Sequence, residues 1–340
     1  MIKIKQKPEH FIVKEKLKLN LKENGQYTYF LLKKTGLNTI DAVNKIADRL
    51  NLSSKYINFG GTKDRNAITE QYISISKGPK NDLYLDGIEL KYLGEGDERI
   101  NLGSLEGNEF EIIIETDQEL RLIKKTINYF DDQRFGMNKN NHVVGKLLVQ
   151  KKFKEACEEL MINAEGNNYV GALKKLHKKI LQLYVHAYQS YLWNETVKEF
   201  IKANMNYYEI DYSLGKLYVP EIINDLNQTK VPLIGFGSEV DNEKLNQIID
   251  VILKKEGINQ RDFIIKEIQG LSSQGDVRNM VVEIKNLNIT DMTKKGIFEK
   301  LFPFIKSKIN SQKQESKKYK LNFFLGRGSY ATIVVKSLFS

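Results

Sequence analysis

Short stretches of the N-terminal half show the alternation of apolar and polar residues that is typical of β-strands. Over 109–115, phenylalanine and isoleucine alternate with glutamate, which predicts a strand in a sheet with one solvated face. The run 68–75 is rich in β-branched and aromatic residues, and 9–15 and 27–32 are shorter apolar runs. Each of these three runs predicts a further strand.

A helical period of apolar residues marks several other stretches. Asn38 is the predicted N-cap of a first helix, because apolar residues follow it at helical spacing. The same spacing predicts helices over roughly 118–130, 145–162, 169–203 and 242–255. The centre of the chain is therefore expected to be mainly helical.

The C-terminal part returns to strand-like composition. Residues 280–284 and 321–325 are largely apolar, and each predicts a strand. A glycine-containing turn over 326–332 leads into the β-branched residues 333–335, which are predicted to form the last strand. We expect this strand to close the sheet that the N-terminal half begins.

Strands on both sides of a helical centre predict an insertion. A chain of 340 residues is long enough for two domains of ordinary size. We expect residues 1–149 and 276–340 to form one discontinuous domain. Residues 150–275 would then form a module inserted into it.

Cysteine and histidine, the usual ligands of protein-bound zinc, are sparse. The single Cys157 excludes a disulfide framework and a cysteine metal site, and the four histidines are scattered without an H-x-x-x-H pair. We therefore expect no metal. The N-terminus lacks the apolar segment of a signal peptide, and no apolar run of about 18 residues occurs. These features predict a soluble, cytoplasmic protein without membrane association.

Positive charge dominates the chain and is unevenly distributed. The formal net charge is +10, and a lysine-rich run over 294–320 contains only two glutamates. Such a run suits contacts with nucleic-acid phosphates, which supply affinity without sequence information. A solvated, lysine-rich connection explains it equally well, so both interpretations stay open.

One loop, Gly-Gly-Thr-Lys-Asp-Arg-Asn-Ala-Ile-Thr-Glu-Gln over 60–71, carries the main candidate chemistry. Two glycines relax steric limits on the backbone, and the carboxylate of Asp64 stands between Lys63 and Arg65. Nearby positive charge favours the ionised carboxylate that a nucleophile or base requires. The competing interpretation is a surface turn whose charges are merely solvated.

The loop resembles the signature G-x-K-D-(R/K)-x-A-x-T-x-Q of the TruD family of tRNA pseudouridine synthases. Further stretches, in the same order along the chain, are similar to other motifs of this family. These stretches are 8–15 (PEHFIVKE), 101–110 (NLGSLEGNEF), 128–136 (NYFDDQRFG), 186–194 (HAYQSYLWN) and 328–332 (GSYAT). Two positions depart from the family pattern, since Asp131 replaces a usual glycine and Gly326 a usual proline.

The resemblance implies roles for the charged residues of the loop and its surroundings. Asp64 corresponds to the catalytic aspartate of the family. Lys63 and Arg65 flank it and are candidate substrate contacts. Lys5 would place a further cation near the carboxylate.

The resemblance also implies a group that holds the substrate base. Phe11, Asn128 and Tyr330 correspond to positions that contact the base or support the loop that holds it. Phe130 would form a second aromatic wall. Asn128 and Tyr330 are expected to meet around one flipped base near Asp64. Without the resemblance, core packing would be the simpler explanation of the three aromatic residues.

The reaction that the resemblance implies is conversion of a uridine in tRNA, by family precedent uridine 13 of the D-arm, to pseudouridine. The C1′–N1 bond is cleaved, the base turns, and C1′ is joined to C5. The uridine must first leave its base stack. No redox or phosphoryl-transfer step occurs, so no cofactor is expected, and tRNA is the expected partner of a monomer. Whether Asp64 attacks C1′, attacks C6 or removes the C2′ proton stays open.

The implied fold is α+β: the mixed, mainly antiparallel sheet of pseudouridine synthases with flanking helices, plus an inserted TruD-specific α/β module. Two alternatives from other classes are a non-catalytic RNA-binding protein on the same scaffold and an Asp-dependent hydrolase. The intact Lys-Asp-Arg sequence argues against the first alternative. The lack of a second carboxylate at motif distance argues against the second.

Overall fold

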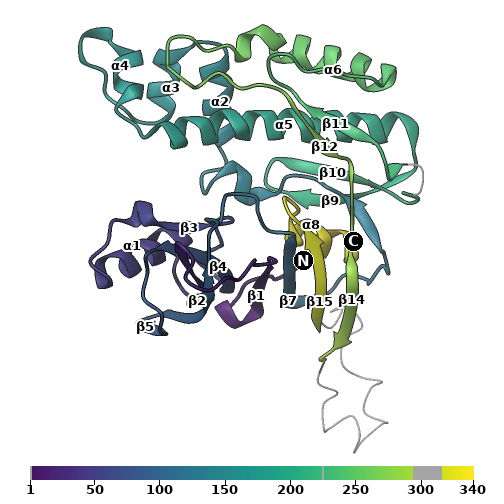
Figure 1. The fold of residues 1–340 in the computed structure, drawn as a ribbon. Coiled ribbons are helices and arrows are strands. Elements are labelled where there is room, and N and C mark those ends of the chain that lie inside the picture. The colour runs from purple at the N-terminus through teal and green to yellow at the C-terminus, as the bar shows by residue number, and fades with distance from the viewer. Residues whose placement is uncertain (1, 224–225, 294–315) are drawn as a thin grey trace, which may run out of the picture. The chain divides into compact units, whose positions relative to one another are not determined.

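The computed structural model describes residues 2–223, 226–293 and 316–340, and the chain divides into two compact units (Figure 1). Most of the lysine-rich run lies outside the described residues. The first unit comprises residues 1–124, 283–328 and 339, and the second comprises residues 125–282, 329–338 and 340. The domain boundaries after 149 and before 276 stay a prediction.

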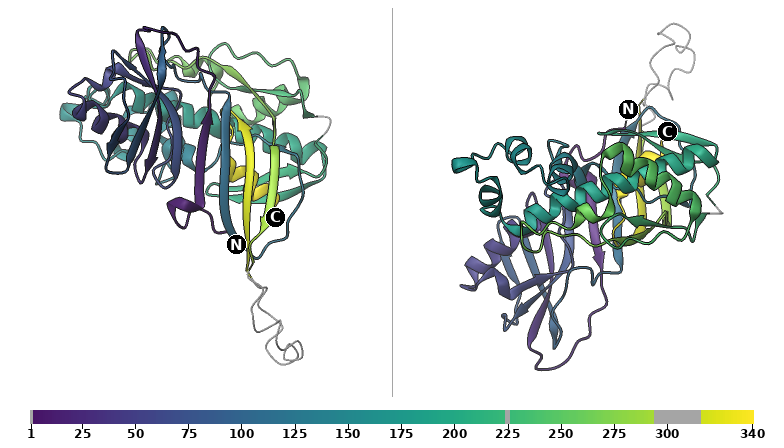
Figure 2. Two further views of the ribbon diagram at one scale, coloured as in Figure 1. Left: turned by 60° about the horizontal axis from the view of Figure 1, so that its bottom comes forward. Right: turned by 90° about the horizontal axis from the view of Figure 1, so that it is seen from above.

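The first unit is built on a nine-stranded mixed sheet, whose strands are displayed side by side in the left view of Figure 2. The strands are β1 (Phe11–Lys16), β2 (Tyr27–Thr35), β3 (Ile57–Phe59), β4 (Ile68–Ser76), β5 (Leu83–Leu85), β6 (Ile88–Gly96), β7 (Gly107–Thr116), β14 (Lys285–Asp291) and β15 (Lys317–Gly326). Their order is β14-β15-β7-β1-β4-β2-β6-β5, with β3 paired to β4. The pair β1–β4 is parallel and the other pairs are antiparallel. The four predicted strands of the N-terminal half, at β1, β2, β4 and β7, are therefore confirmed.

Helix α1 (Thr39–Arg49) covers part of this sheet. As predicted, Asn38 is its N-cap, and the side chain accepts a hydrogen bond from the Asp41 amide. Ile46 of α1 is buried together with Phe30 of β2 and Ile73 of β4. This core packs α1 on the sheet at β2 and β4.

Among its described residues, the second unit contains six α-helices and three two-stranded ribbons. The helices are α2 (Asn141–Val149), α3 (Phe153–Glu159), α4 (Tyr169–Lys174), α5 (Lys178–Asn204), α6 (Glu243–Glu256) and α8 (Ala331–Leu338). The ribbons pair β9 (Tyr207–Tyr212) with β10 (Gly215–Pro220), β11 (Lys230–Leu233) with β12 (Asp276–Asn279), and β8 (Lys125–Ile127) with β13 (Val281–Glu283). The 27-residue α5 is central, since α2 and α6 pack on its first half and the ribbons on its second.

The helix predicted over 118–130 does not form. Its apolar residues do not share one buried face, because Leu122 is 81% exposed whereas Ile127 is fully buried. Residues 125–127 instead pair as β8 with β13. The helix predicted over 145–162 is two helices, α2 and α3, and Lys151 between them adopts the left-handed conformation (φ 59°) that ends a helix.

The predicted last strand, residues 333–335, is wrong, because these residues lie in the helix α8. Their β-branched side chains favour a strand only weakly. Ile333, Val334 and Val335 are all buried, so packing in the second unit overrides the local preference. The sheet is extended by β15, which was predicted over 321–325 and pairs with β7 and β14.

Candidate functional site

The carboxylate of Asp64 lies in the loop between β3 and β4 and remains partly accessible, with 19% of the side chain exposed. Its carboxylate forms a close ion pair with the ammonium of Lys5. The same ammonium lies 4.2 Å from the centre of the Phe11 ring. Three residues predicted from the resemblance are thus brought together, with a cation between a carboxylate and an aromatic face.

A buried lysine fixes the backbone of the loop at Asp64. Lys34, at the end of β2, is 1% exposed and donates hydrogen bonds to the carbonyls of Leu37 (2.6 Å), Asp64 (2.9 Å) and Lys63 (3.4 Å). Burial lowers the pKa of Lys34 to about 8. The main chain of the candidate catalytic residue is therefore attached to a strand of the sheet.

A second set of hydrogen bonds ties the loop to α1 and β4. The Lys63 amide donates to the hydroxyl of Thr39 (2.8 Å), which donates to the Gln71 side chain (2.8 Å). The Gln71 amide in turn donates to the carbonyl of Gly61 (3.0 Å). Thr39 and Gln71 are buried, so the chain of bonds is protected from water and holds the loop in one conformation.

The side chain of Lys63 points into the protein. Its ammonium pairs with Glu15 of β1 (2.6 Å) and donates to Asn108 of β7 (2.8 Å). Glu15 and Asn108 are directly opposite each other in the antiparallel β1–β7 pair, so the lysine bridges two strands. Both charged side chains are almost fully buried. Lys63 supports the loop in this structure, and its contact with substrate stays a prediction.

Arg65 does not pair with the Asp64 carboxylate beside it in the sequence but with a main-chain carbonyl, and the two glycines of the loop have backbone conformations open to other residues. Arg65 is exposed and its guanidinium donates to the carbonyl of Gly36 (3.1 Å). Neither Gly60 nor Gly61 adopts a left-handed backbone. The loop is therefore held by the surrounding side chains rather than by glycine-specific conformations.

The second unit brings together the other three predicted residues, Asn128, Phe130 and Tyr330. The rings of Phe130 and Tyr330 meet edge to face, 6.0 Å apart. Asn128 follows β8, and its amide donates to the Met280 carbonyl (2.8 Å). The backbone of Phe130 is held on both sides by Asn194 of α5, which accepts from its amide (2.9 Å) and donates to its carbonyl (2.8 Å).

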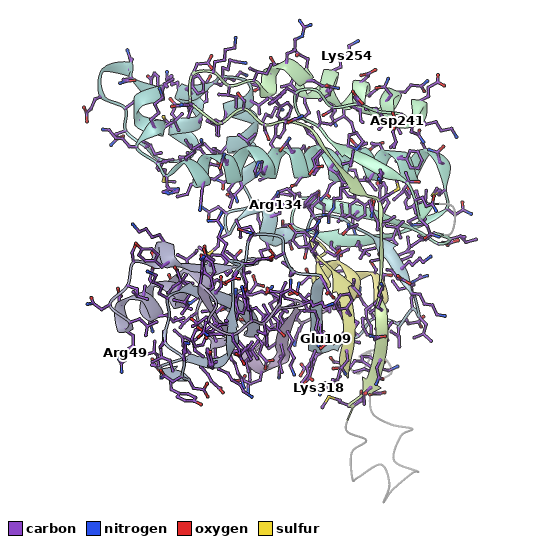
Figure 3. All side chains as sticks on the ribbon, in the orientation of Figure 1. Arg49, Glu109, Arg134, Asp241, Lys254 and Lys318 are labelled. Atoms are coloured by element: carbon purple, nitrogen blue, oxygen red, sulfur yellow. The ribbon has the colours of Figure 1, made fainter. Side chains whose placement is uncertain are left out.

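Two arginines complete this second group. The guanidinium of Arg278, on β12, lies 4.1 Å from the centre of the Phe130 ring and donates to Asn128. That of Arg134 (Figure 3) lies 5.4 Å from the same ring and donates to the hydroxyl of Ser190 (2.9 Å). Neither arginine is a candidate site residue on the sequence alone. Phe130 is 5% exposed, so its predicted contact with the base stays a prediction.

The supporting residues Glu15 and Lys34 are not candidates in the sequence analysis, although both carry a signal in the alternation of their strands. Glu15 shares the inward face of β1 with Phe11 and Val13 by strand alternation. A carboxylate in that pattern requires a buried partner. Lys34 carried the same signal, because strand alternation places it on the inward face of β2 with Phe30 and Leu32.

The departure at Asp131 has a partner of its own. The Asp131 carboxylate is buried and accepts a hydrogen bond from Lys336 of α8 (2.8 Å). Its backbone is extended (φ −101°), so the conformation does not require the glycine usual in the family. The substitution therefore adds an ion pair to the turn that follows Phe130.

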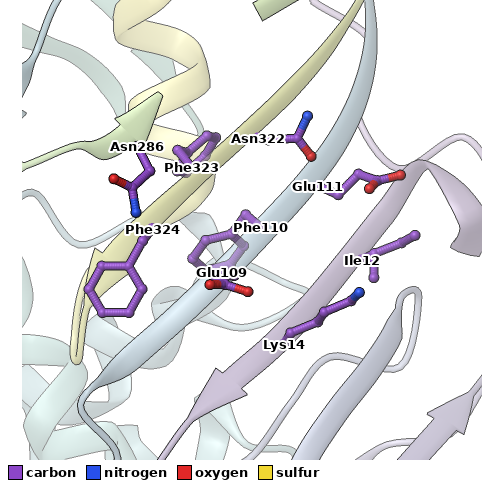
Figure 4. Close-up of a pocket in the computed structure, with 9 residues that line it drawn as sticks. All are labelled: Ile12, Lys14, Glu109, Phe110, Glu111, Asn286, Asn322, Phe323 and Phe324. Atoms are coloured by element: carbon purple, nitrogen blue, oxygen red, sulfur yellow. The ribbon is translucent and has the colours of Figure 1, made fainter. Parts of the chain in front are cut away.

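A hollow of about 210 Å³ lies over β1, β7, β14 and β15 (Figure 4). It is lined in part by Ile12 and Lys14, which alternate along β1 with Phe11 and Glu15. Successive side chains of a strand point to opposite faces. The hollow therefore opens on the other side of β1 from Phe11 and from the Lys5–Asp64 ion pair that lies over its ring.

Within residues 2–223, 226–293 and 316–340, no three His, Cys, Asp or Glu side chains are grouped so that they could hold a metal ion. None of the helices within these ranges has the length and hydrophobicity that a membrane-spanning helix requires.

Comparisons with known proteins agree on one family. The model of the family "tRNA pseudouridine synthase D (TruD)" matches residues 1–167, 161–212 and 221–338. A protein of Nanoarchaeum equitans named "Probable tRNA pseudouridine synthase D" is 32% identical, over 99% of this chain and 98% of the relative. The tRNA pseudouridine synthase D of Aquifex aeolicus is 30% identical, over 99% of this chain and 98% of the relative. The crystal structure of a TruD protein from Methanosarcina mazei has a TM-score of 0.66 at 24% identity, over 99% and 93% of the two chains, which confirms the expected α+β fold.

Proposed function

Because the chain belongs to the TruD family of tRNA pseudouridine synthases, we propose that it isomerises uridine 13 in the D-arm of tRNA, with Asp64 as the catalytic carboxylate. The class of enzyme follows from the family, whose members are isomerases that convert uridine to pseudouridine. The proposal adds the position of the uridine and the identity of the reactive group.

The observation that carries the proposal is that Asp64 combines an accessible carboxylate with a fixed backbone. Its carboxylate is partly exposed, whereas its backbone is held by the buried Lys34 and its neighbour by Thr39. The Lys5 ammonium beside it stabilises a negative charge. An ionised, accessible and fixed carboxylate is what a nucleophile or base needs.

The chemistry requires no group beyond a carboxylate and donors for the base. The C1′–N1 bond breaks, the base turns, and C1′ bonds to C5, while the C5 proton is released and N1 gains a proton. Asp64 either forms a transient bond at C1′ or C6, or removes the C2′ proton. We propose that Asn128 contacts the edge of the same base and that Phe11 and Tyr330 support it through their rings.

The test is turnover by the variant Asp64→Asn, which keeps the size of the side chain and removes its charge. We expect pseudouridine formation in a tRNA transcript to fall at least about 10⁴-fold, the scale seen when a principal catalytic group is removed. Tritium release from C5-tritiated uridine measures turnover, and chemical mapping gives the position. Binding of tRNA should survive, because phosphate contacts dominate affinity.

The matched control is Asp48→Asn, which removes an exposed carboxylate of α1 in the same unit. This variant should turn over at the wild-type rate. Wild-type turnover by Asp64→Asn would refute the catalytic assignment. Product at a position other than uridine 13, or unchanged product when that uridine is replaced by cytidine, would refute the proposed target.

A further inference from the structure

We propose that Arg278 is a positioning residue that locks the side-chain amide of Asn128 in one orientation and so makes the site selective for uracil over cytosine. The inference rests on the proposed function, in which Asn128 contacts the edge of the base. The two residues are 150 positions apart in the chain. They meet because β12 carries Arg278 close to the residue that follows β8.

The hydrogen bonds around Asn128 leave its amide one orientation. Arg278 donates from Nη2 to the Asn128 side-chain oxygen (2.7 Å) and from Nε to the Asn128 carbonyl (2.9 Å). On the other side, the Asn128 Nδ2 donates to the carbonyl of Asn279 (3.3 Å). A guanidinium can only donate and a carbonyl can only accept. Turning the amide by 180° would therefore set donor against donor and acceptor against acceptor.

Burial makes such a reversal unfavourable. Asn128 is 8% exposed, and unsatisfied polar groups are penalised strongly where water cannot replace the lost partner. The guanidinium itself lies over two aromatic rings, with its Cζ 4.1 Å from the centre of the Phe130 ring and 5.4 Å from that of the Trp193 ring. Burial lowers the pKa of Arg278 to about 10, so the donors are present at neutral pH.

A fixed amide can distinguish the edges of two pyrimidines. Asn128 keeps one lone pair on its side-chain oxygen and one proton on its side-chain nitrogen for a ligand. Uracil presents the N3–H donor beside carbonyl acceptors, which matches this pair. Cytosine presents N3 as an acceptor beside its amino donor, which would match the reversed amide. The fixed orientation of the Asn128 amide therefore allows a bidentate contact with uracil and not with cytosine.

The experiment measures binding of two RNA hairpins that differ only in uridine or cytidine at the target position. Binding is measured in the Asp64→Asn background, so that no product forms, and at raised salt, which reduces the share of phosphate contacts. A bidentate contact to a base edge discriminates by about 5- to 150-fold. We expect a preference for the uridine hairpin in that range, and a preference below about twofold when Arg278→Gln is added, because glutamine can pair with either orientation of the amide.

Two further variants separate positioning from packing. Arg134→Gln removes the other cation over Phe130 but leaves Arg278 on Asn128, so it should weaken both hairpins alike and keep their ratio. Arg278→Lys retains a donor-only group and should recover part of the preference. An unchanged ratio in Arg278→Gln, or no uridine preference in the Asp64→Asn protein, would overturn the inference. Failure of the proposed function would appear separately, as absence of pseudouridine formation by the wild-type enzyme.

Discussion

The Asp64 group of the first unit and the Asn128 group of the second unit are stabilised by different interactions. Around Asp64, charged side chains pair with each other and with main-chain carbonyls, through Lys5, Lys34 and Lys63. Around Asn128, aromatic rings pack edge to face and the cations are arginines lying over those rings. The first group thus depends on protonation states, and the second depends on shape and on the direction of hydrogen bonds.

This difference matches the tasks proposed for the two groups. A reactive carboxylate has to keep its charge and its position, and nearby cations with fixed backbone bonds supply both. Recognition of a flat base needs surfaces and an edge of known polarity, which rings and a locked amide supply. Disruption of the first group should therefore reduce stability or depend on pH, whereas disruption of the second should slow turnover at any pH near neutrality.

The largest effect on stability is expected from Lys63→Met. This change leaves the fully buried Glu15 carboxylate without its partner at 2.6 Å. Removing one member of a buried pair destabilises a protein by about 3–5 kcal/mol, which urea denaturation can measure. The double variant Glu15→Leu/Lys63→Met removes both charges and should regain much of the loss.

The control for this prediction is Lys320→Met, which breaks a half-exposed pair with Glu111 (2.8 Å) on the same sheet. That loss should stay below about 1 kcal/mol, as for surface pairs. Equal losses in Lys63→Met and Lys320→Met would show that the buried pair has no special role. The Asp64 group would then not depend on buried charge pairs, and the contrast with the Asn128 group would be lost.

A smaller effect, on turnover, is expected from Tyr330→Ala. Its ring packs edge to face on Phe130 at 6.0 Å, and an aromatic face that stacks on a base contributes about 1–3 kcal/mol. Turnover should fall about 5- to 150-fold, and tRNA affinity should fall less because phosphates dominate binding. Tyr330→Phe keeps the ring and should stay near the wild-type rate. A larger loss of affinity than of turnover in Tyr330→Ala would contradict this role.

Elements with local signals were predictable from the sequence, whereas most contacts between distant residues were not; the Lys5–Asp64 ion pair, which the resemblance implied, is an exception. The N-cap at Asn38 and the helix after it follow from a few neighbouring residues, and both are confirmed. The β-branched residues 333–335 misled the prediction, because burial in the second unit overrides their weak preference for strands. The Lys-Asp-Arg order located Asp64, yet the inward direction of Lys63 depends on Glu15, 48 positions earlier in the printed sequence.

The same reasoning explains why the sequence named Asn128 but not its partner. Asn128 lies in a stretch that resembles a family motif, whereas Arg278 lies in a stretch without one. The two come together because β8 pairs with β13, which follows β12 directly in the chain. Side chains that hold a reactive or recognising residue are set by topology, which no short pattern of residues encodes.

The smallest expected effect is a decrease in turnover when the ammonium of Lys34 loses its proton. Its ammonium donates to three carbonyls, including that of Asp64 at 2.9 Å, but a neutral amine has only two protons to donate. Because burial lowers its pKa to about 8, turnover should fall about tenfold between pH 7 and pH 9, as the protonated fraction does. Turnover by Lys34→Arg should stay flat over this range, since a guanidinium keeps its proton.

The sign of the linked stability change separates this effect from alkaline unfolding. The pKa of Lys34 is about 8 in the folded protein and near its ordinary value of 10.5 in the unfolded chain. Between these values the unfolded chain binds more protons at this residue, so its contribution to the free energy of unfolding rises with pH. Relative to Lys34→Met, the wild-type protein should therefore gain stability from pH 8 to pH 10 while its turnover falls. Turnover that stays constant from pH 7 to pH 9, or that falls equally in Lys34→Arg, would separate the Asp64 loop from the charge of Lys34.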